Sequence, residues 1–317
     1  MRTRSRPRLF LTDRGAGEPV LLITGWTISS AVFDPVAPLY EPHVRIIAYD
    51  HRGAGRSDPW PGPVSIATLA ADAARVLADR GLRSAHVVGL SMGAAVALEL
   101  ALRMPQRVRS LILVGGGAGG PRTALPGVRD ASAAVRSLVA DSVRHRAPWP
   151  AAVLFSDGFR ERHPDEVAAY LPFFAVHRAP PWTTGWQALA VACFGRRAAL
   201  GRVQAPTLIL HGGRDVLVPV ANAHQLADAI PRAELHVVED AGHAVPLEHP
   251  EASAELLTAW VRSHAARRPP QPRRIEVVRE QVARPLALPA GALSNAGEAV
   301  LQLPRSALSV VLGAARR

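Results

Sequence analysis

Three side chains in this sequence are of the types that nucleophilic catalysis requires. Ser91 lies in Gly-Leu-Ser-Met-Gly (89–93), and Asp215 and His243 each follow a later apolar stretch. A serine hydroxyl is a weak nucleophile near neutral pH, so it needs a base within hydrogen-bond reach and an acid that orients the base. Taken alone, the five-residue motif also fits a glycine-bounded helix start with Ser91 as its cap. The chemistry therefore depends on whether the fold brings the three groups together.

The elements around these residues alternate between strand and helix. Branched apolar runs predict strands at 19–24, 44–49, 85–88, 110–114, 207–211 and 234–238, with an edge strand at 8–12 followed by a turn at 13–17. Helical periodicity predicts helices at 64–80, 91–100, 220–230 and 250–263. This alternation indicates a parallel sheet that is covered by helices on both faces. In such a sheet Ser91, Asp215 and His243 all follow strands at the carboxyl edge.

The alternation is interrupted between residues 118 and 200, where no strand is predicted. This segment holds most of the aromatic residues and predicts a helical cap over the carboxyl edge of the sheet, where open α/β folds bind ligands. We expect a core formed by 1–117 and 201–264, a cap at 118–200, and a Pro/Arg-rich extension at 265–317. The aromatic candidates for substrate contacts are Trp26, Phe155, Phe173, Phe174, Trp182 and Trp186, although many cap aromatics also fill the core of the cap itself.

Composition narrows the class of protein. The formal net charge is +11, but the excess arginines lie near the two ends, with nine arginines against three glutamates in 265–317. Nucleic-acid binding needs a basic folded face, so this distribution disfavours it. No run approaches the length of a membrane span or a signal-peptide core, and we expect a cytoplasmic protein. Cys193 is the single cysteine, which excludes an internal disulfide. The extension is either a solvated tail or a segment that docks on a membrane surface or on a partner chain, such as a second copy in a homo-oligomer.

Four ordered motifs together carry a resemblance to a known family. They are Asp-His-Arg-Gly-Ala-Gly-Arg-Ser (50–57), the serine motif at 89–93, Pro-Thr-Leu-Ile-Leu-His-Gly (206–212) with Asp215, and Ala-Gly-His (241–243) with Glu248 and Pro250. In this order they resemble the α/β-hydrolase superfamily, in its cap-bearing serine branch that includes 3-oxoadipate enol-lactonase-like and esterase members. The resemblance implies an α/β-hydrolase fold, which is a mostly parallel, doubly wound sheet with an inserted helical cap.

The resemblance also implies roles for single residues. Ser91 would be the nucleophile, His243 the base and later the acid, and Asp215 the orienting acid. The backbone N–H groups of Trp26 and Met92 would form the oxyanion hole. Thr24 stands where the family usually has histidine, which leaves the support of that loop open. Asp50 heads a turn that is usually structural in the family, so no chemical role is assigned to it.

The expected activity is hydrolysis of a carboxylic ester or lactone of a small to medium apolar substrate, without a cofactor or metal. Other outcomes on the same fold remain open: a thioesterase, a C–C bond hydrolase, a perhydrolase or an acyltransferase. A biosynthetic tailoring or cyclising protein, or a ligand-binding protein, would use the pocket without acylating Ser91. The sequence does not choose the substrate, because this choice lies in the fold of the cap.

Overall fold

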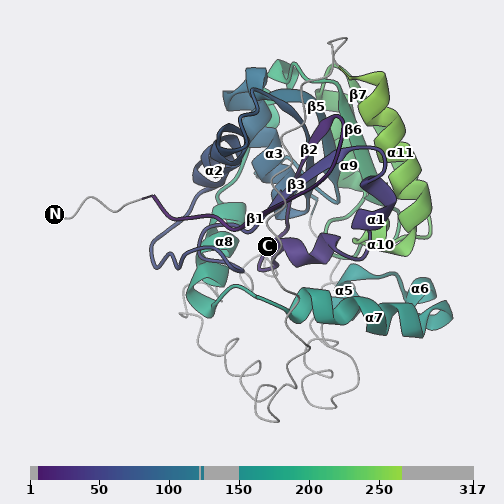
Figure 1. Ribbon diagram of the computed structural model, residues 1–317. Helices are drawn as coiled ribbons and strands as arrows, with labels where there is room; N and C mark the ends of the chain where they lie inside the picture. The colour runs from purple at the N-terminus through teal and green to yellow at the C-terminus, as the bar shows by residue number, and fades with distance from the viewer. Residues whose placement is uncertain (1–5, 121–122, 125–149, 266–317) are drawn as a thin grey trace, which may run out of the picture. The chain divides into compact units, whose positions relative to one another are not determined.

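The computed structural model describes residues 6–120, 123–124 and 150–265, and the fold below is built from these residues. Seven strands within them form one sheet in the order β1-β3-β2-β4-β5-β6-β7 (Figure 1). The strands are β1 (Leu11–Gly15), β2 (Pro19–Ile23), β3 (Arg45–Tyr49), β4 (Ala85–Leu90), β5 (Val108–Val114), β6 (Thr207–Gly212) and β7 (Ala233–Val238). Only the edge pair β1–β3 is antiparallel among these strands. The predicted mostly parallel sheet is confirmed.

The first strand differs from its sequence-based prediction. Strand β1 runs from Leu11 to Gly15, so it includes Asp13 and Arg14, which were expected to form a turn. Across the pair, Arg45 of β3 donates from Nε to Asp13 Oδ1 at 2.8 Å. This cross-strand ion pair lets a charged segment stay extended at an edge where one side faces solvent.

Helices cover both faces of the sheet, so nearly all residues of the central strands are buried. One face, which includes Leu21, Val87 and Leu111, packs against α2 (Ile66–Asp79), α3 (Met92–Arg103) and α9 (Ala221–Ala229). The other face, which includes Leu22 and Val88, packs against α1 (Ala37–Tyr40) and α11 (Pro250–Ser263). Figure 1 shows α2 and α11 on opposite sides of the strands. The second face becomes important for the substrate below.

A helical insertion lies between β5 and β6. Its described helices are α5 (Pro150–Leu154), α6 (Asp157–Arg162), α7 (Pro164–Ala175) and α8 (Pro181–Ala192). A further short helix, α10 (Val245–Glu248), follows β7. Residues 121–122 and 125–149 of the predicted cap, and 266–317 of the predicted extension, lie outside the described residues. Within the described part of the chain, no helix is both long and apolar enough to span a bilayer.

The buried histidine on β4 makes the stability of the fold depend on pH. His86 is fully buried beside Ser110, whose Oγ lies 2.8 Å from His86 Nδ1. Burial, together with the charges of Arg109 and His264, lowers the pKa of His86 to about 4. In the unfolded chain the imidazole titrates near 6.5, so between about pH 6.5 and 4 the unfolded state binds the extra proton. The stabilisation is complete above this window and is lost as the pH falls through it.

The variant His86→Gln is therefore expected to flatten this acid limb. The unaltered chain should lose up to about 1.4 kcal/mol of unfolding free energy per pH unit from this group between pH 6.5 and 4, and His86→Gln should not. Urea unfolding at several pH values in this window measures the difference. Replacing the exposed His224 by glutamine is the control and should leave the slope as it is. An equal slope in all three proteins would contradict the assignment.

Candidate active site

Ser91 stands at the turn between β4 and α3, where the backbone is strained. Its φ and ψ are 57° and −118°, a combination that a residue with a side chain rarely adopts. The N–H of Ser91 donates to the carbonyl of Val114 at 2.8 Å, which holds the turn against β5. A Cβ on Gly89 would lie 2.2 Å from the carbonyl oxygen of Gly93, and one on Gly93 would lie 2.2 Å from that of Ile23. The two glycines of the motif are therefore required by close backbone approach.

Asp215 and His243 form a buried hydrogen-bonded pair, although 28 positions separate them in the chain. Asp215 follows β6 and His243 follows β7, and these strands are parallel neighbours, so their carboxyl ends lie side by side. His243 Nδ1 lies 2.7 Å from Asp215 Oδ2. The carboxylate therefore holds the imidazole with its Nδ1–H toward Asp215 and with Nε2 on the other side of the ring.

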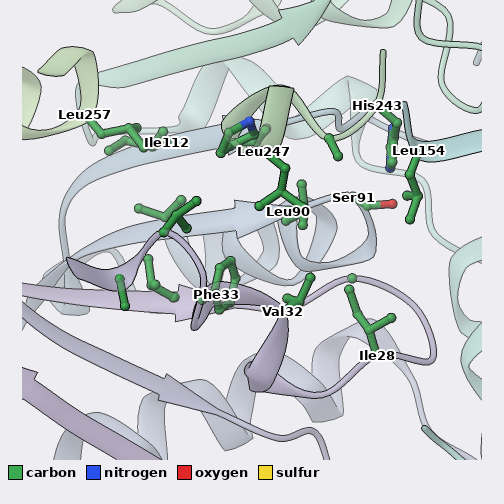
Figure 2. Close-up of a pocket in the computed structure, with 18 of the residues that line it drawn as sticks. Ile28, Val32, Phe33, Leu90, Ser91, Ile112, Leu154, His243, Leu247 and Leu257 are labelled. Atoms are coloured by element: carbon green, nitrogen blue, oxygen red, sulfur yellow. The ribbon is translucent and has the colours of Figure 1, made fainter. Parts of the chain in front are cut away.

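The second nitrogen of His243 is left available beside Ser91. Among the described residues no hydrogen bond reaches His243 Nε2, although this atom is buried. Ser91 and His243 line the same cavity, and Figure 2 shows their side chains near each other at one end of it. Ser91 Oγ makes no hydrogen bond within the described part of the chain either. Both polar atoms therefore lack a partner among the described residues, and both side chains line one cavity.

The carboxylate of Asp215 is held in its charged form. Burial raises its pKa, but the charge of His243 and hydrogen bonds from His211, His243 and the Val218 N–H outweigh burial and lower the pKa well below the usual range. The N–H groups of Leu217 and Val218 donate to Asp215 Oδ1 at 2.9 and 2.8 Å. Oδ2 is left to face the two histidines. Asp215 thus presents a fixed negative charge to His243.

Two backbone N–H groups near Ser91 have no partner among the described residues. Met92 is the first residue of α3, so its N–H lies at the positive end of the helix dipole. Trp26 lies in the loop after β2, directly after Gly25. A Cβ built on Gly25 would lie 3.3 Å from Ser91 Cβ, so this loop packs against the serine. Met92 directly follows Ser91 in the chain, and Trp26 lines the same cavity as Ser91.

The loop that contains Trp26 is supported without the usual histidine. Thr24 is fully buried, and its carbonyl oxygen lies 3.2 Å from His51 Nε2. From the insertion, Gln187 accepts from the N–H of Thr27 at 2.9 Å, and the carbonyl of Thr184 accepts from the indole N–H of Trp26 at 2.9 Å. Thr27 has a positive φ of 67°, so the Gln187 contact holds a strained residue. Hydrogen bonds from α8 and His51 therefore support this loop, although Thr24 stands where the family usually has histidine.

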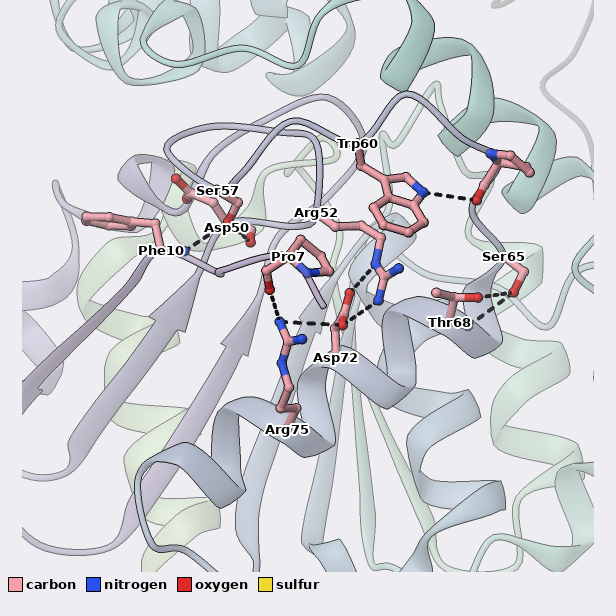
Figure 3. Close-up of polar contacts among 11 residues, drawn as sticks. Pro7, Phe10, Asp50, Arg52, Ser57, Trp60, Ser65, Thr68, Asp72 and Arg75 are labelled. Atoms are coloured by element: carbon pink, nitrogen blue, oxygen red, sulfur yellow. Dashed lines mark hydrogen bonds and ion pairs between the residues drawn. The ribbon is translucent and has the colours of Figure 1, made fainter. Parts of the chain in front are cut away.

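The turn at 50–58 is structural, as its family resemblance implies. Asp50 is fully buried and accepts from the N–H and Oγ of Ser30 at 2.6 and 2.7 Å and from the N–H of Arg56 at 2.8 Å. Arg52 then forms a two-bonded ion pair with Asp72 of α2, at 2.6 and 2.7 Å (Figure 3). The Ser30–Asp50 bonds tie the loop after β2 to this turn, and the Arg52–Asp72 pair ties the turn to α2. Asp50 is not among the described residues that line the cavity beside Ser91.

The six aromatic candidates are divided by the structure. Trp26 and Phe174 line the cavity beside Ser91. The other four do not belong to the described lining. Phe155 is buried in a cluster of the insertion, where it stacks on Phe159 at 5.7 Å between ring centroids. Phe173 is half-buried on α7, Trp182 is 56% exposed on α8, and Trp186 packs against the core on the α2–α3 side.

Glu248 joins the insertion to the loop that carries His243. Its buried carboxylate accepts from the N–H of Ser156 at 2.9 Å, from Ser156 Oγ at 2.7 Å and from the N–H of Gly242 at 2.8 Å. The N–H of Ala244 donates to the carbonyl of Leu154 at 2.8 Å. Gly242 is thus linked through Glu248 to Ser156, just before α6, and Ala244 is bonded directly to Leu154 at the end of α5. The side chain of Glu248 joins the His243 loop to the helical insertion.

Replacing Glu248 by alanine is expected to lower the unfolding free energy by about 3 kcal/mol, because three buried donors lose their acceptor. The loss of the Gly242 contact should also shift His243, and kcat should fall about 10-fold. Chemical unfolding and steady-state kinetics measure the two effects. Glu255→Ala, on the exposed side of α11, is the matched control and should change neither. If both alanine variants behave alike, Glu248 does not position His243.

Sequence reasoning missed two contributors to the site. His211, in the motif that ends β6, has its Nε2 3.3 Å from Asp215 Oδ2 and 2.7 Å from the carbonyl oxygen of Val218. It could have been found from its place four residues before Asp215. Gln187 carries no such signal, because its helix lies far from the loop in sequence. Glu248 was noted near His243, but its bonds to Ser156 depend on the fold of the insertion.

Comparison with known proteins identifies the class. Residues 18–250 match the family described as alpha/beta hydrolase fold, and the chain belongs to this family. It is 30% identical over 262 residues to a putative carbamate hydrolase, RutD, of Azorhizobium caulinodans. This alignment covers 80% of this chain and 94% of the relative. It is 32% identical over 268 residues to 2-hydroxymuconate semialdehyde hydrolase of Pseudomonas putida, covering 79% of this chain and 89% of the relative.

Two solved structures are similar in fold. A thermophilic esterase from Thermogutta terrifontis superposes with a TM-score of 0.69 at 26% identity, over 84% of this chain and 97% of the esterase. The enol-lactonase from Burkholderia xenovorans gives a TM-score of 0.67 at 22% identity, over 81% and 97% of the two chains, a likeness that concerns the fold alone. The chain is therefore an α/β hydrolase, and its similar proteins act on several kinds of bond.

Proposed function

We propose that this protein is a serine hydrolase that cleaves a carboxylic ester or lactone of a small to medium apolar substrate. The observation that carries the proposal is the Asp215–His243 pair at 2.7 Å, with the buried Nε2 of His243 unpaired in the cavity that Ser91 lines. This is the donor–acceptor order that a serine nucleophile needs. Asp215 is the orienting acid, His243 the base and Ser91 the nucleophile.

The reaction has two steps, acylation and deacylation of Ser91, and each step passes through a tetrahedral intermediate. Ser91 Oγ bonds to the carbonyl carbon while its proton passes to His243 Nε2, and the C–O bond to the alcohol then breaks as Nε2 returns the proton to the leaving oxygen. Water next bonds to the acyl carbon and gives a proton to Nε2. The Ser91–acyl bond then breaks as Nε2 returns this proton to Ser91 Oγ, which releases the acid and restores the hydroxyl. With a lactone, alcohol and acid leave as one molecule.

The negative oxygen of the tetrahedral intermediate is assigned to the N–H groups of Trp26 and Met92. Preorganised donors of this kind contribute about 3 kcal/mol each to lowering the barrier. Both groups are free of other partners among the described residues, which supports the assignment. The hydrogen bonds from α8 and His51 to the loop supply the rigidity that such donors need.

The lining of the cavity favours an ester or lactone over the substrates of the C–C hydrolases. Other similar proteins are named for 2-hydroxy-6-oxononadienedioate, a dicarboxylate. The described lining of the Ser91 cavity holds no arginine that could pair with such carboxylates. Carbamate hydrolysis uses the same acyl chemistry and is the second candidate, because a relative with this name is 30% identical.

A panel of substrates of matched size tests the proposal. An aryl butyrate ester, a γ-lactone, an N-alkyl carbamate and a vinylogous 1,5-diketone acid are compared by kcat/KM, with pre-steady-state detection of phenol release. The expected result is a burst with the ester and the highest kcat/KM for the ester or lactone. Turnover of the carbamate or diketone at least about 100-fold above the ester, without a burst, would overturn it.

A further inference from the structure

The cavity beside Ser91 (the Ser91 cavity) does not end beneath the helical insertion. It continues over the sheet face that α1 and α11 cover, so it extends into the core of the protein. In Figure 2, Ser91 and Leu154 lie at one end of this cavity, and Ile112 and Leu257 lie at the other. A substrate carbonyl at Ser91 therefore has enclosed apolar space next to it.

Alternate strand residues line the cavity in three rows. The rows, from Ser91 inward, are Leu90 with Val114, Leu22 with Val88 and Ile112, and Val20 with Ile46. Val20 is paired with His86, four residues before Leu90 on β4. At about 3.3 Å per residue, the rows extend about 13 Å away from Leu90. The cavity is long in the direction of the strands.

The cavity is also narrow. Its volume is about 140 Å³, similar to the engineered cavity of about 150 Å³ that holds one benzene molecule. This volume, spread over such a length, suits a single extended chain better than a ring system. Since C–C bonds near 1.5 Å advance an extended chain by about 1.3 Å each, the length and volume together correspond to about six to ten carbons.

The inner end of the cavity offers no charge to a ligand. Its described lining contains no arginine, aspartate or glutamate. Tyr40 lines it, and burial raises the pKa of this phenol, so the group stays neutral. His86 is paired with Val20 in the innermost row. Burial lowers the pKa of His86 to about 4, so its imidazole is neutral near pH 7. An alkyl end fits these surroundings, whereas a terminal carboxylate would be buried without a partner.

The residues at the inner end are buried as well as apolar. Val44, Leu257 and Val261 are at least 94% buried there. The acyl group stays bonded to Ser91 until water arrives, whereas the alcohol leaves after the first step. The buried apolar space that adjoins Ser91 therefore suits the acyl part of the substrate.

We infer that the Ser91 cavity binds the acyl chain, and that the substrates are esters or lactones of unbranched fatty acids of about six to ten carbons. The inference rests on the proposed function, because it takes Ser91 as the residue that is acylated. It adds the substrate class and assigns Leu257 as a specificity-determining residue at the end of the chain.

A series of p-nitrophenyl esters from acetate to laurate tests the inference. We expect kcat/KM to rise about 2–4-fold per methylene up to eight to ten carbons and then to fall. Leu257→Phe should move the optimum to shorter chains by two or more carbons, and Leu257→Ala should move it to longer ones. The control is Leu256→Phe, the same change at a neighbouring position that does not line the cavity, and it should leave the optimum in place. A second series, with one short acid and alcohols of two to ten carbons, should be nearly flat.

The outcomes separate the two proposals. If Ser91→Ala is inactive but neither Leu257 variant moves the acyl optimum, or if the alcohol series responds instead, the acyl-chain inference is wrong and the proposed function stands. If Ser91→Ala keeps full turnover, the proposed function itself fails. Product inhibition of the unaltered protein requires no variant. Octanoate should inhibit at least about 10-fold more strongly than butyrate, and equal inhibition would overturn the inference.

Discussion

Replacing Ser91 by alanine is expected to lower kcat for ester hydrolysis by about 10⁵–10⁶-fold, since no acyl-enzyme can form. KM should change little, because the apolar cavity and the oxyanion donors remain. The fold should also remain, and alanine leaves the strain at φ 57° in place without adding volume. Stopped-flow and long-time assays with a p-nitrophenyl ester measure the loss.

The control for Ser91→Ala is an equally small substitution, Ser29→Ala, in a loop at the same edge of the sheet. Ser29→Ala removes a buried hydroxyl that, among the described residues, donates to the carbonyl of Val176 at 3.2 Å. It should keep kcat within about 10-fold, given a lost neutral hydrogen bond of about 1 kcal/mol. Residual activity of Ser91→Ala within about 10-fold of the unaltered protein would show that catalysis proceeds without the serine.

Asp215→Asn is expected to lower kcat by about 10⁴-fold. An amide can still accept from the N–H groups of Leu217 and Val218, so the loop should keep its shape. Its NH₂ group, however, faces His243 Nδ1 and favours the tautomer with a proton on Nε2, which cannot accept the proton of Ser91. The charge that stabilises the imidazolium is lost as well. Steady-state kinetics, with thermal unfolding to confirm folding, measures the effect.

Asp228→Asn, on the exposed side of α9, is the matched control for this substitution and should keep full activity.

The mechanism also predicts that the losses of kcat caused by Ser91→Ala and by Asp215→Asn are not additive. The double variant Ser91→Ala with Asp215→Asn should be about as inactive as Ser91→Ala alone, because both residues act in one unit. Additive losses would mean that Asp215 acts independently of the serine.

The positions of the three chemical groups could be predicted because each depends on a local pattern. Gly89 and Gly93 flank Ser91 for reasons of backbone approach that any strand-to-helix elbow shares, and Asp215 and His243 follow strands whose apolar runs are plain in the sequence. That successive side chains of β2, β4 and β5 point to opposite faces of the sheet likewise follows from strand geometry. The error at β1 arose because the Asp13–Arg45 pair joins two strands and has no local signal.

The shape of the substrate site could not be predicted in the same way. Which aromatic residues face Ser91 depends on how α5–α8 pack, and Phe155 and Phe174 are equally apolar in sequence although only Phe174 lines the cavity. The inner part of the cavity is lined by Val20, Val88 and Ile112, which any sequence analysis assigns to the core. Only the packing of α1 and α11 leaves the space open beside them.

The most direct test is the mass of the protein during turnover. The chain is mixed with p-nitrophenyl octanoate, quenched in acid within the burst, and examined by intact and peptide mass spectrometry. The expected result is a gain of one octanoyl group on the peptide that contains Ser91, absent from Ser91→Ala. An octanoyl group on another residue, or an unmodified protein while the burst is in progress, would contradict the account.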